Sequence, residues 1–183
     1  MQPIIPNSLP TVTFFGDASS KDKRYMVAGG FVVGGADISK IEAEIDAIRN
    51  AADMQSEFHW SDYRGGRRKE KAYKALIDLG FELTRGGNVR GAFHAIIAKF
   101  DGYDHRRGGG ENRDTSVNRM YYQLCLHRLS RFYGHARQIH VRLDAGNDSE
   151  DIAKMRNEVC ADAYKTSRNP MAKYRSKKYL SHI

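Results

Sequence analysis

The spacing of apolar and polar positions along the chain predicts a mixture of strands and helices. Two apolar runs near the start, separated by polar residues 16–24, are typical of a β-hairpin with a long connection. Isoleucines spaced three and four residues apart then predict an amphipathic helix. We expect strands at Thr11–Phe15, Tyr25–Val33, Glu57–Trp60 (or an extended segment there), Val89–Ala98 and Ile139–Leu143, and helices at Asp37–Ala52, Arg67–Thr84, Thr115–Tyr133 and Ser149–Thr166.

This order of elements, β-β-α-β-α-β-α-β-α, predicts the α/β class, with a mixed β-sheet flanked by helices. The strand at 89–98 is apolar enough to be central in that sheet. Three prolines make residues 1–10 an extended lead-in. The length of 183 residues fits a single domain over 1–183, with a basic tail at 167–183.

Composition narrows the class of protein. Hydrophobic residues make up 40% of the chain and charged residues 28%, which argues against wholesale disorder. There is no apolar run of the ~20 residues that a membrane span needs, and the first residues lack a signal-peptide pattern. Cys125 and Cys160 form no metal-binding or redox motif. We therefore expect a soluble, cytoplasmic protein with no membrane partner.

The charge is concentrated in two places. The chain has 30 basic and 22 acidic residues, a net charge of +8, and the segment 163–183 holds six cations and no acid. A second cluster at 64–74 has Glu70 as its only acid. These patches suit the phosphate backbone of nucleic acid, although a solvated helix face and a disordered tail remain alternatives. The candidate nucleic-acid contacts are Arg64, Arg67, Arg68, Lys173, Arg175, Lys177 and Lys178.

Three carboxylates lie at or beside predicted strands. Asp17 follows the first strand, Asp144 ends the last one, and Glu57 lies between two helices. Carboxylates gathered at one sheet edge repel one another and need a cation, for which Mg²⁺ or Mn²⁺ is the natural choice. A pair of such ions activates water for phosphodiester hydrolysis. Taken singly, each Asp is better explained as a turn residue, and only their combination with the basic patches favours a metal site.

These segments also resemble a known family. The start Phe15-Gly16-Asp17-Ala18-Ser19, the Gly29-Gly30 pair in the second apolar run, the stretch Glu57-Phe58-His59-Trp60-Ser61 and Leu143-Asp144 are similar to the motifs of the domain of unknown function 3800 family. The resemblance spans roughly residues 12–165 and implies an RNase H-like fold and a divalent-metal nuclease. It also implies that Asp17, Glu57 and Asp144 are the catalytic, metal-binding carboxylates.

Asp148 is a further metal-ligand candidate, with a helix N-cap as the alternative. Two departures from the family pattern keep a second hypothesis open: Ala18 stands where the family has Glu, and the chain stops early, as a fragment or a short branch. We therefore weigh a metal-dependent nuclease against a catalytically degenerate module that binds nucleic acid or protein. The oligomeric state is open.

Overall fold

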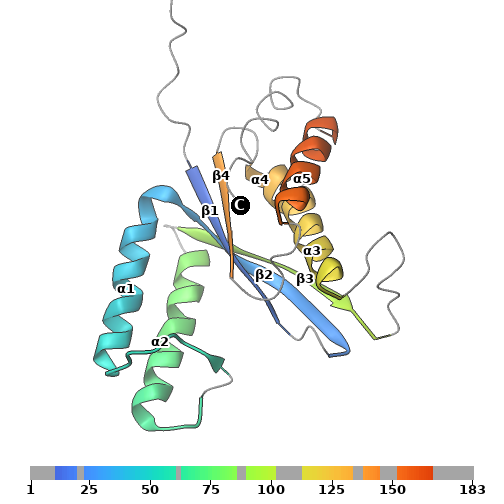
Figure 1. Ribbon diagram of the computed structural model, residues 1–183. Helices are drawn as coiled ribbons and strands as arrows, with labels where there is room; N and C mark the ends of the chain where they lie inside the picture. Colours follow the sequence, from blue (N-terminus) through green and yellow to red (C-terminus); the bar gives the residue numbers. More distant parts are fainter. Residues whose placement is uncertain are drawn as a thin grey trace, which may run out of the picture. The chain divides into compact units, whose positions relative to one another are not determined.

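The structure is a computed structural model that describes residues 11–19, 23–60, 63–85, 90–101, 113–133, 138–144 and 152–166 (Figure 1). The chain divides into two compact units. The first, which we call the sheet unit, comprises residues 1–35 and 93–183, and the second, the helix-pair unit, comprises residues 36–92. The expectation of a single domain over 1–183 stays a prediction.

The sheet unit is built on a mixed sheet. Its strands are β1 (Thr11–Ser19), β2 (Tyr25–Gly34), β3 (Gly91–Lys99) and β4 (Gln138–Leu143), in the order β3-β2-β1-β4. Strand β1 runs antiparallel to β2 and parallel to β4, and the helical connection from β3 to β4 crosses from one edge of the sheet to the other. The predicted mixed sheet with flanking helices is confirmed, whereas the RNase H-like assignment stays a prediction.

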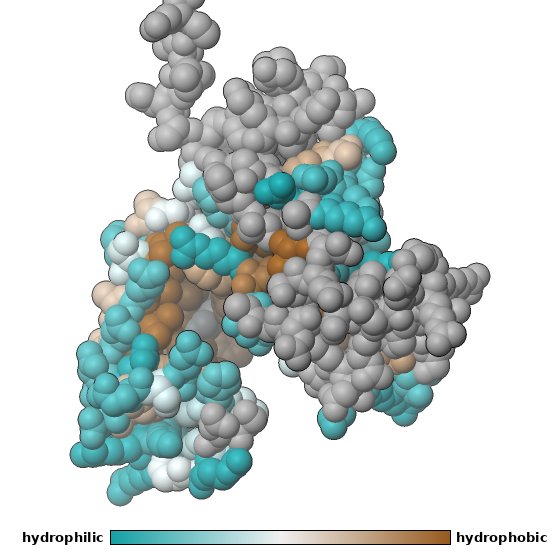
Figure 2. Space-filling model, viewed as in Figure 1, coloured by the Kyte–Doolittle hydropathy of each residue, from teal (hydrophilic) through white to brown (hydrophobic). Residues whose placement is uncertain are grey.

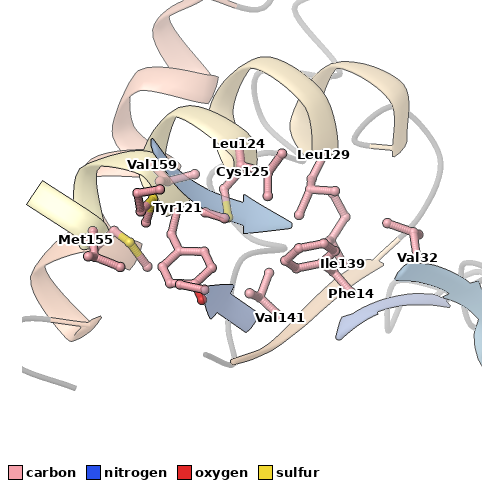
Figure 3. Close-up of a cluster of buried hydrophobic side chains, with 14 of the residues drawn as sticks. Phe14, Val32, Tyr121, Leu124, Cys125, Leu129, Ile139, Val141, Met155 and Val159 are labelled. Atoms are coloured by element: carbon pink, nitrogen blue, oxygen red, sulfur yellow. The ribbon is translucent and has the colours of Figure 1, made fainter. Parts of the chain in front are cut away.

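Helices cover one face of this sheet (Figure 3). They are α3 (Arg113–Leu124), the π-helical turn η3 (Cys125–Leu129), α4 (Ser130–Tyr133) and α5 (Ile152–Thr166). Fully buried side chains from both layers interlock, among them Phe14, Leu124, Leu129 and Val159. Tyr122 of α3 also donates a 2.5 Å hydrogen bond to Asp162 of α5. Partial burial and this bond raise the pKa of Tyr122 to about 12.

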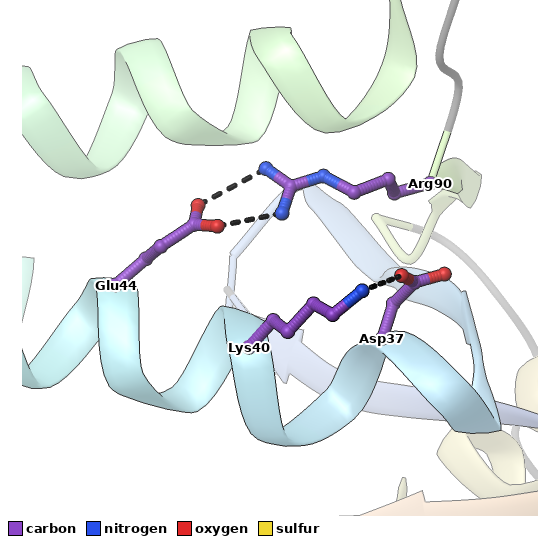
Figure 4. A network of polar contacts seen from close by, with 4 residues as sticks. All are labelled: Asp37, Lys40, Glu44 and Arg90. Atoms are coloured by element: carbon purple, nitrogen blue, oxygen red, sulfur yellow. Dashed lines mark hydrogen bonds and ion pairs between the residues drawn. The ribbon is translucent and has the colours of Figure 1, made fainter.

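The helix-pair unit contains α1 (Ile38–Ala51), preceded by the short 3₁₀ turn η1 (Gly35–Asp37), and α2 (Arg67–Thr84). A small core of Ala52, Met54, Ala72 and Tyr73 lies between them. Arg90 donates two hydrogen bonds to Glu44, at 2.6 and 3.0 Å, and its backbone N–H bonds to Leu83 (Figure 4). This bidentate pair lowers the pKa of Glu44. It also joins the segment that follows α2 to helix α1.

Several predicted boundaries are close to those observed. The helices predicted at 37–52 and 67–84 correspond to α1 and α2, and the strand at 139–143 corresponds to β4. The helix at 115–133 forms, but its middle widens into the π turn η3. The start of the helix predicted at 149–166 lies outside the described residues, which include its part from Ile152. The lead-in 1–10 and the basic tail 167–183 also lie outside them.

Two expectations are wrong, and a third is settled only in part. Strand β1 does not end at Phe15 but continues through Ser19, because residues 16–19 pair with Val27–Gly30 of β2. Strand β3 is an edge strand of the described sheet and not the central strand that its apolar run predicts. Its exposure alternates, and the apolar side chains of Phe93 and Ile97 lie on the exposed side. For Glu57–Trp60, residues 57–59 are not assigned to a strand, and the alternative of an extended segment stays a prediction.

Candidate functional site

Asp17 lies within β1 and on the face of the sheet opposite the helical core. Its neighbours Gly16 and Ala18 are buried, whereas Asp17 and Ser19 are exposed, as the two-residue period of a strand requires. The Asp17 carboxylate accepts a 2.6 Å hydrogen bond from the backbone N–H of Ala18. The strand therefore fixes this carboxylate while leaving its outer side open.

Asp144 lies beside Asp17 on the neighbouring strand. Gly16 and Leu143 are partners in the parallel β1–β4 register, and the Asp144 N–H donates a 3.0 Å hydrogen bond to the Gly16 carbonyl. Asp17 and Asp144 each follow one member of that pair, on strands that are about 5 Å apart. The sequence prediction that these two carboxylates share a sheet edge is thus consistent with the backbone register, although Asp17 is inside its strand rather than after it.

Both carboxylates line one open hollow of about 530 Å³. Arg142 lines it too, and its guanidinium lies 5.5 Å from the centre of the Phe15 ring. Gly29, which pairs with Asp17 in β2, leaves the adjoining position without a side chain. The hollow combines two carboxylates with a cation and with the rings of Phe15 and Phe93, a combination suited to a phosphate-bearing, partly apolar ligand.

Gly30 keeps β1 and β2 in contact beside this hollow. It pairs with Gly16, and a Cβ at Gly30 would run into the backbone carbonyl of Phe15. The substitution Gly30→Ala is expected to destabilise the protein by roughly 1 to 3 kcal/mol, because the two strands must separate to admit the methyl group. Urea denaturation followed by circular dichroism measures this loss.

Gly35→Ala is the matched control for that substitution. A Cβ at Gly35 would meet the hydroxyl oxygen of Thr11, which is a side-chain atom that can rotate to another rotamer. We expect Gly35→Ala to cost clearly less than Gly30→Ala. Equal losses for the two variants would contradict the close backbone approach at Gly30.

Glu57 and Asp148, the other predicted ligands, are not brought to the hollow by the described geometry. Glu57 belongs to the helix-pair unit, where its carboxylate is 85% exposed and lies 3.4 Å from the Nε2 atom of His59. Asp148 lies outside the described residues. Among the residues described, no group of three or more His, Cys, Asp or Glu side chains is placed to hold a metal ion. The roles of Glu57 and Asp148 stay predictions.

Some of the predicted nucleic-acid contacts lie in the described part of the chain and the others lie outside it. Arg64, Arg67 and Arg68 are exposed at the beginning of α2, in the helix-pair unit. Figure 2 shows a largely hydrophilic surface at the end of this unit where α2 begins in Figure 1. The four tail residues from Lys173 to Lys178 lie outside the described part of the chain.

Arg142 is the residue of the hollow that sequence reasoning missed. It precedes Asp144 by two positions, so the period of a strand places both on one face, and Ser19 is related to Asp17 in the same way. The signal was therefore present in the sequence. The alternation that identifies β4 as a strand also places Arg142 beside Asp144.

Comparison with protein-family models, with curated proteins and with solved structures found no match. The resemblance to the domain of unknown function 3800 family accordingly stays a prediction. Within the part of the chain that the structure describes, none of the helices has both the length and the apolar character needed to cross a membrane.

Proposed function

We propose that this chain is a divalent-metal-dependent phosphodiesterase that acts on nucleic acid, on an RNase H-like fold. The observation that supports this most directly is the adjacency of Asp17 and Asp144 on parallel strands, with both side chains on one open hollow. Carboxylates on neighbouring strands that face one hollow repel each other, and a bound cation relieves that repulsion. The strand order, with β1 central and paired with both β2 and β4, is compatible with the proposed fold.

The donor chemistry fits Mg²⁺ or Mn²⁺. These hard cations take oxygen ligands, and Mg²⁺ commonly uses one or two carboxylates while substrate phosphates and water complete its shell. Asp17 and Asp144 would hold the ion, with Glu57 and Asp148 as further proposed ligands. A bound ion of this kind supplies Lewis acidity and a more acidic water for phosphodiester hydrolysis.

The other residues of the hollow have roles of their own in this proposal. The Arg142 guanidinium offers a planar fork of donors that matches a phosphate, and it is held over the Phe15 ring. The Ala18 N–H orients the Asp17 carboxylate through its hydrogen bond. The chain thus fixes the carboxylates by backbone contacts and presents a cation for the scissile phosphate beside them.

A second candidate function is a degenerate module that binds nucleic acid or protein without cleaving it. One specific observation favours it: the described residues contribute two adjacent carboxylates and no group of three donors. Ala18, which stands where the resembled family has Glu, is only 9% exposed and belongs to the buried core cluster. It therefore adds no ligand to the hollow.

Mn²⁺ titration separates the two candidates. We expect the intact protein to bind Mn²⁺, and Asp17→Asn and Asp144→Asn each to weaken the affinity by about tenfold or more, because each removes a charged oxygen ligand. Isothermal calorimetry, or the paramagnetic resonance signal of free Mn²⁺, measures this. Asp101→Asn is the matched control, since Asp101 is an exposed acid of the same unit, near Arg24.

The nuclease proposal is wrong if the intact protein shows no Mn²⁺ binding that these two substitutions reduce. It is equally wrong if Asp101→Asn reduces the affinity as much as Asp17→Asn does. The second result would mean that net charge attracts the ion and that the pair on β1 and β4 forms no specific site.

A further inference from the structure

The helix-pair unit carries a group of aromatic rings that the proposed hydrolysis does not use. We call Phe58, Trp60, Tyr63 and Tyr73 the Trp60 cluster. The rings of Trp60 and Tyr63 are stacked, with centroids 6.0 Å apart and an interplanar angle of 22°. Tyr73 packs against both of them, at 5.7 and 5.2 Å, and against Phe58 at 5.2 Å. Four aromatic side chains from a loop and a helix thus form one contiguous cluster.

One end of the Trp60 cluster is fixed and the other is open. Tyr73 is buried on α2, and its hydroxyl donates a 2.7 Å hydrogen bond to the carbonyl of His59. Trp60 is 70% exposed, an unusual position for the largest apolar side chain. A rigid base with an exposed indole is the arrangement of a binding platform, because the ring is held in place without being covered.

Basic residues adjoin this platform at the start of α2. Residues 64–74 contain six basic side chains against one acid, Glu70, a local charge of 6 − 1 = +5. Glu70 is already paired with Lys74 at 2.6 Å. Arg64 directly follows Tyr63 in the chain, and Lys69 lies one helical turn before Tyr73 on the same side of α2. The cations therefore adjoin the rings on the α2 side of the cluster.

Lys74 of α2 also lies near the cluster. Its pKa is raised by the hydrogen bond and charge of Glu70 and, to a smaller extent, by the nearby Tyr63 hydroxyl. The ammonium group of α2 and the aromatic loop are thus close enough to interact electrostatically.

We propose that the Trp60 cluster is a binding site for single-stranded nucleic acid, in which a base stacks on Trp60 while Arg64, Arg67 and Lys69 bind the adjoining phosphates. Every base has a π face, and an exposed aromatic ring beside a basic groove binds single strands through it. In a duplex those faces are covered by neighbouring bases. The charge favours this polyanion over a protein partner, whose hot spot would pair an exposed Trp with an apolar pocket.

This inference rests on the proposed function for its biological meaning, since it names a single strand as the substrate class of the nuclease. The binding itself needs neither a metal ion nor Asp17. Its failure and the failure of the hydrolase proposal are therefore distinguishable when binding is measured in the presence of EDTA.

Trp60 is the only tryptophan of the chain, so intrinsic tryptophan fluorescence reports on this residue alone. We expect an oligothymidylate of about 12 nucleotides, within the usual site sizes for single strands, to quench this emission in EDTA. A duplex of the same length should bind more weakly and quench less. Asp101→Asn should give the same quenching as the intact protein, because Asp101 is an exposed acid that belongs neither to the Trp60 cluster nor to the residues that line the hollow.

Fluorescence anisotropy of a labelled oligothymidylate then measures the contribution of the ring. Trp60→Ala is expected to weaken binding roughly 10- to 100-fold, the effect of losing one stacked base, and Trp60→Phe to restore most of the affinity. Phe81→Ala is the matched control, because Phe81, on α2 of the same unit, is 49% exposed and lies outside the cluster. The affinity of the Phe81→Ala variant for oligothymidylate should equal that of the intact protein.

Three results would overturn the inference. The first is an unchanged affinity of Trp60→Ala for oligothymidylate, and the second is equal quenching of the Trp60 emission by duplex and single strand. The third is an equal loss of affinity in Trp60→Ala and Phe81→Ala. A common melting temperature for the variants shows that folding is intact, as expected for exposed side chains. If Trp60→Ala unfolds, a failure of oligothymidylate to quench the emission of the intact protein still refutes the inference.

Discussion

Asp17→Asn is expected to lower Mg²⁺-dependent cleavage of nucleic acid by at least roughly 10²- to 10³-fold. A metal ion stabilises the charge of the transition state by several kcal/mol, and a factor of ten in rate corresponds to about 1.4 kcal/mol. Removing the charge of one ligand should therefore forfeit a large part of the rate. The measurement is the initial rate of hydrolysis of a labelled single strand, with and without Mg²⁺.

The same substitution should leave folding nearly unchanged. Asp17 is exposed, and asparagine keeps the Oδ1 atom that accepts the hydrogen bond from the Ala18 N–H. We expect a change in stability within about 0.5 kcal/mol, as for most surface substitutions. Asp101→Asn, which removes an exposed acid from the same unit, should keep full activity. A fully active Asp17→Asn enzyme would exclude Asp17 from the chemistry.

Much of the fold could be predicted because periodicity reports burial directly. The isoleucines of α1 and the apolar positions of α2 follow the helical period, and β4 follows the strand period. Strand pairing has no such local signal. Residues 16–19 contain Gly, Asp and Ser, which favour turns, but pairing with β2 extends the strand through them. Tertiary hydrogen bonds here outweigh local propensity.

The position of β3 shows a second limit. Its apolar run is typical of a central strand, but β3 lies at the edge of the described sheet and leaves Phe93 and Ile97 exposed. Sequence gives the number of apolar residues in a strand and not the number of its neighbours. The contacts that decide this come from segments far away in the chain.

The candidate site was predictable to the extent that strand register could be guessed. Asp17 and Asp144 follow apolar runs, and parallel pairing of β1 with β4 makes them neighbours. The Trp60 cluster had no comparable signal, because Tyr73 meets Trp60 only when α2 packs on the preceding loop. Likewise, the Arg90–Glu44 pair joins residues 46 positions apart, with no motif to mark it.

Phe14→Ala should be the most destabilising of the substitutions considered. Phe14 is fully buried in the core between the sheet and the helices α3 and α5 (Figure 3). Truncating a buried Phe costs about 3 to 5 kcal/mol, from lost transfer energy and the cavity that remains. Since domains are stable by about 5 to 15 kcal/mol, this loss is a large share of the total. Urea denaturation followed by circular dichroism measures it.

Phe93→Ala is the matched control, because Phe93 is 56% exposed and its ring pairs with Phe31 on the other face of the sheet, at 5.1 Å. We expect that variant to lose only about 1 kcal/mol. Similar losses for the two variants would mean that Phe14 is not in a packed core.

Phe14 and Asp17 lie on opposite faces of β1, so one face of the strand packs in the core and the other carries the candidate site. Substitutions on its inner face should therefore lower stability, whereas those on its outer face should lower activity.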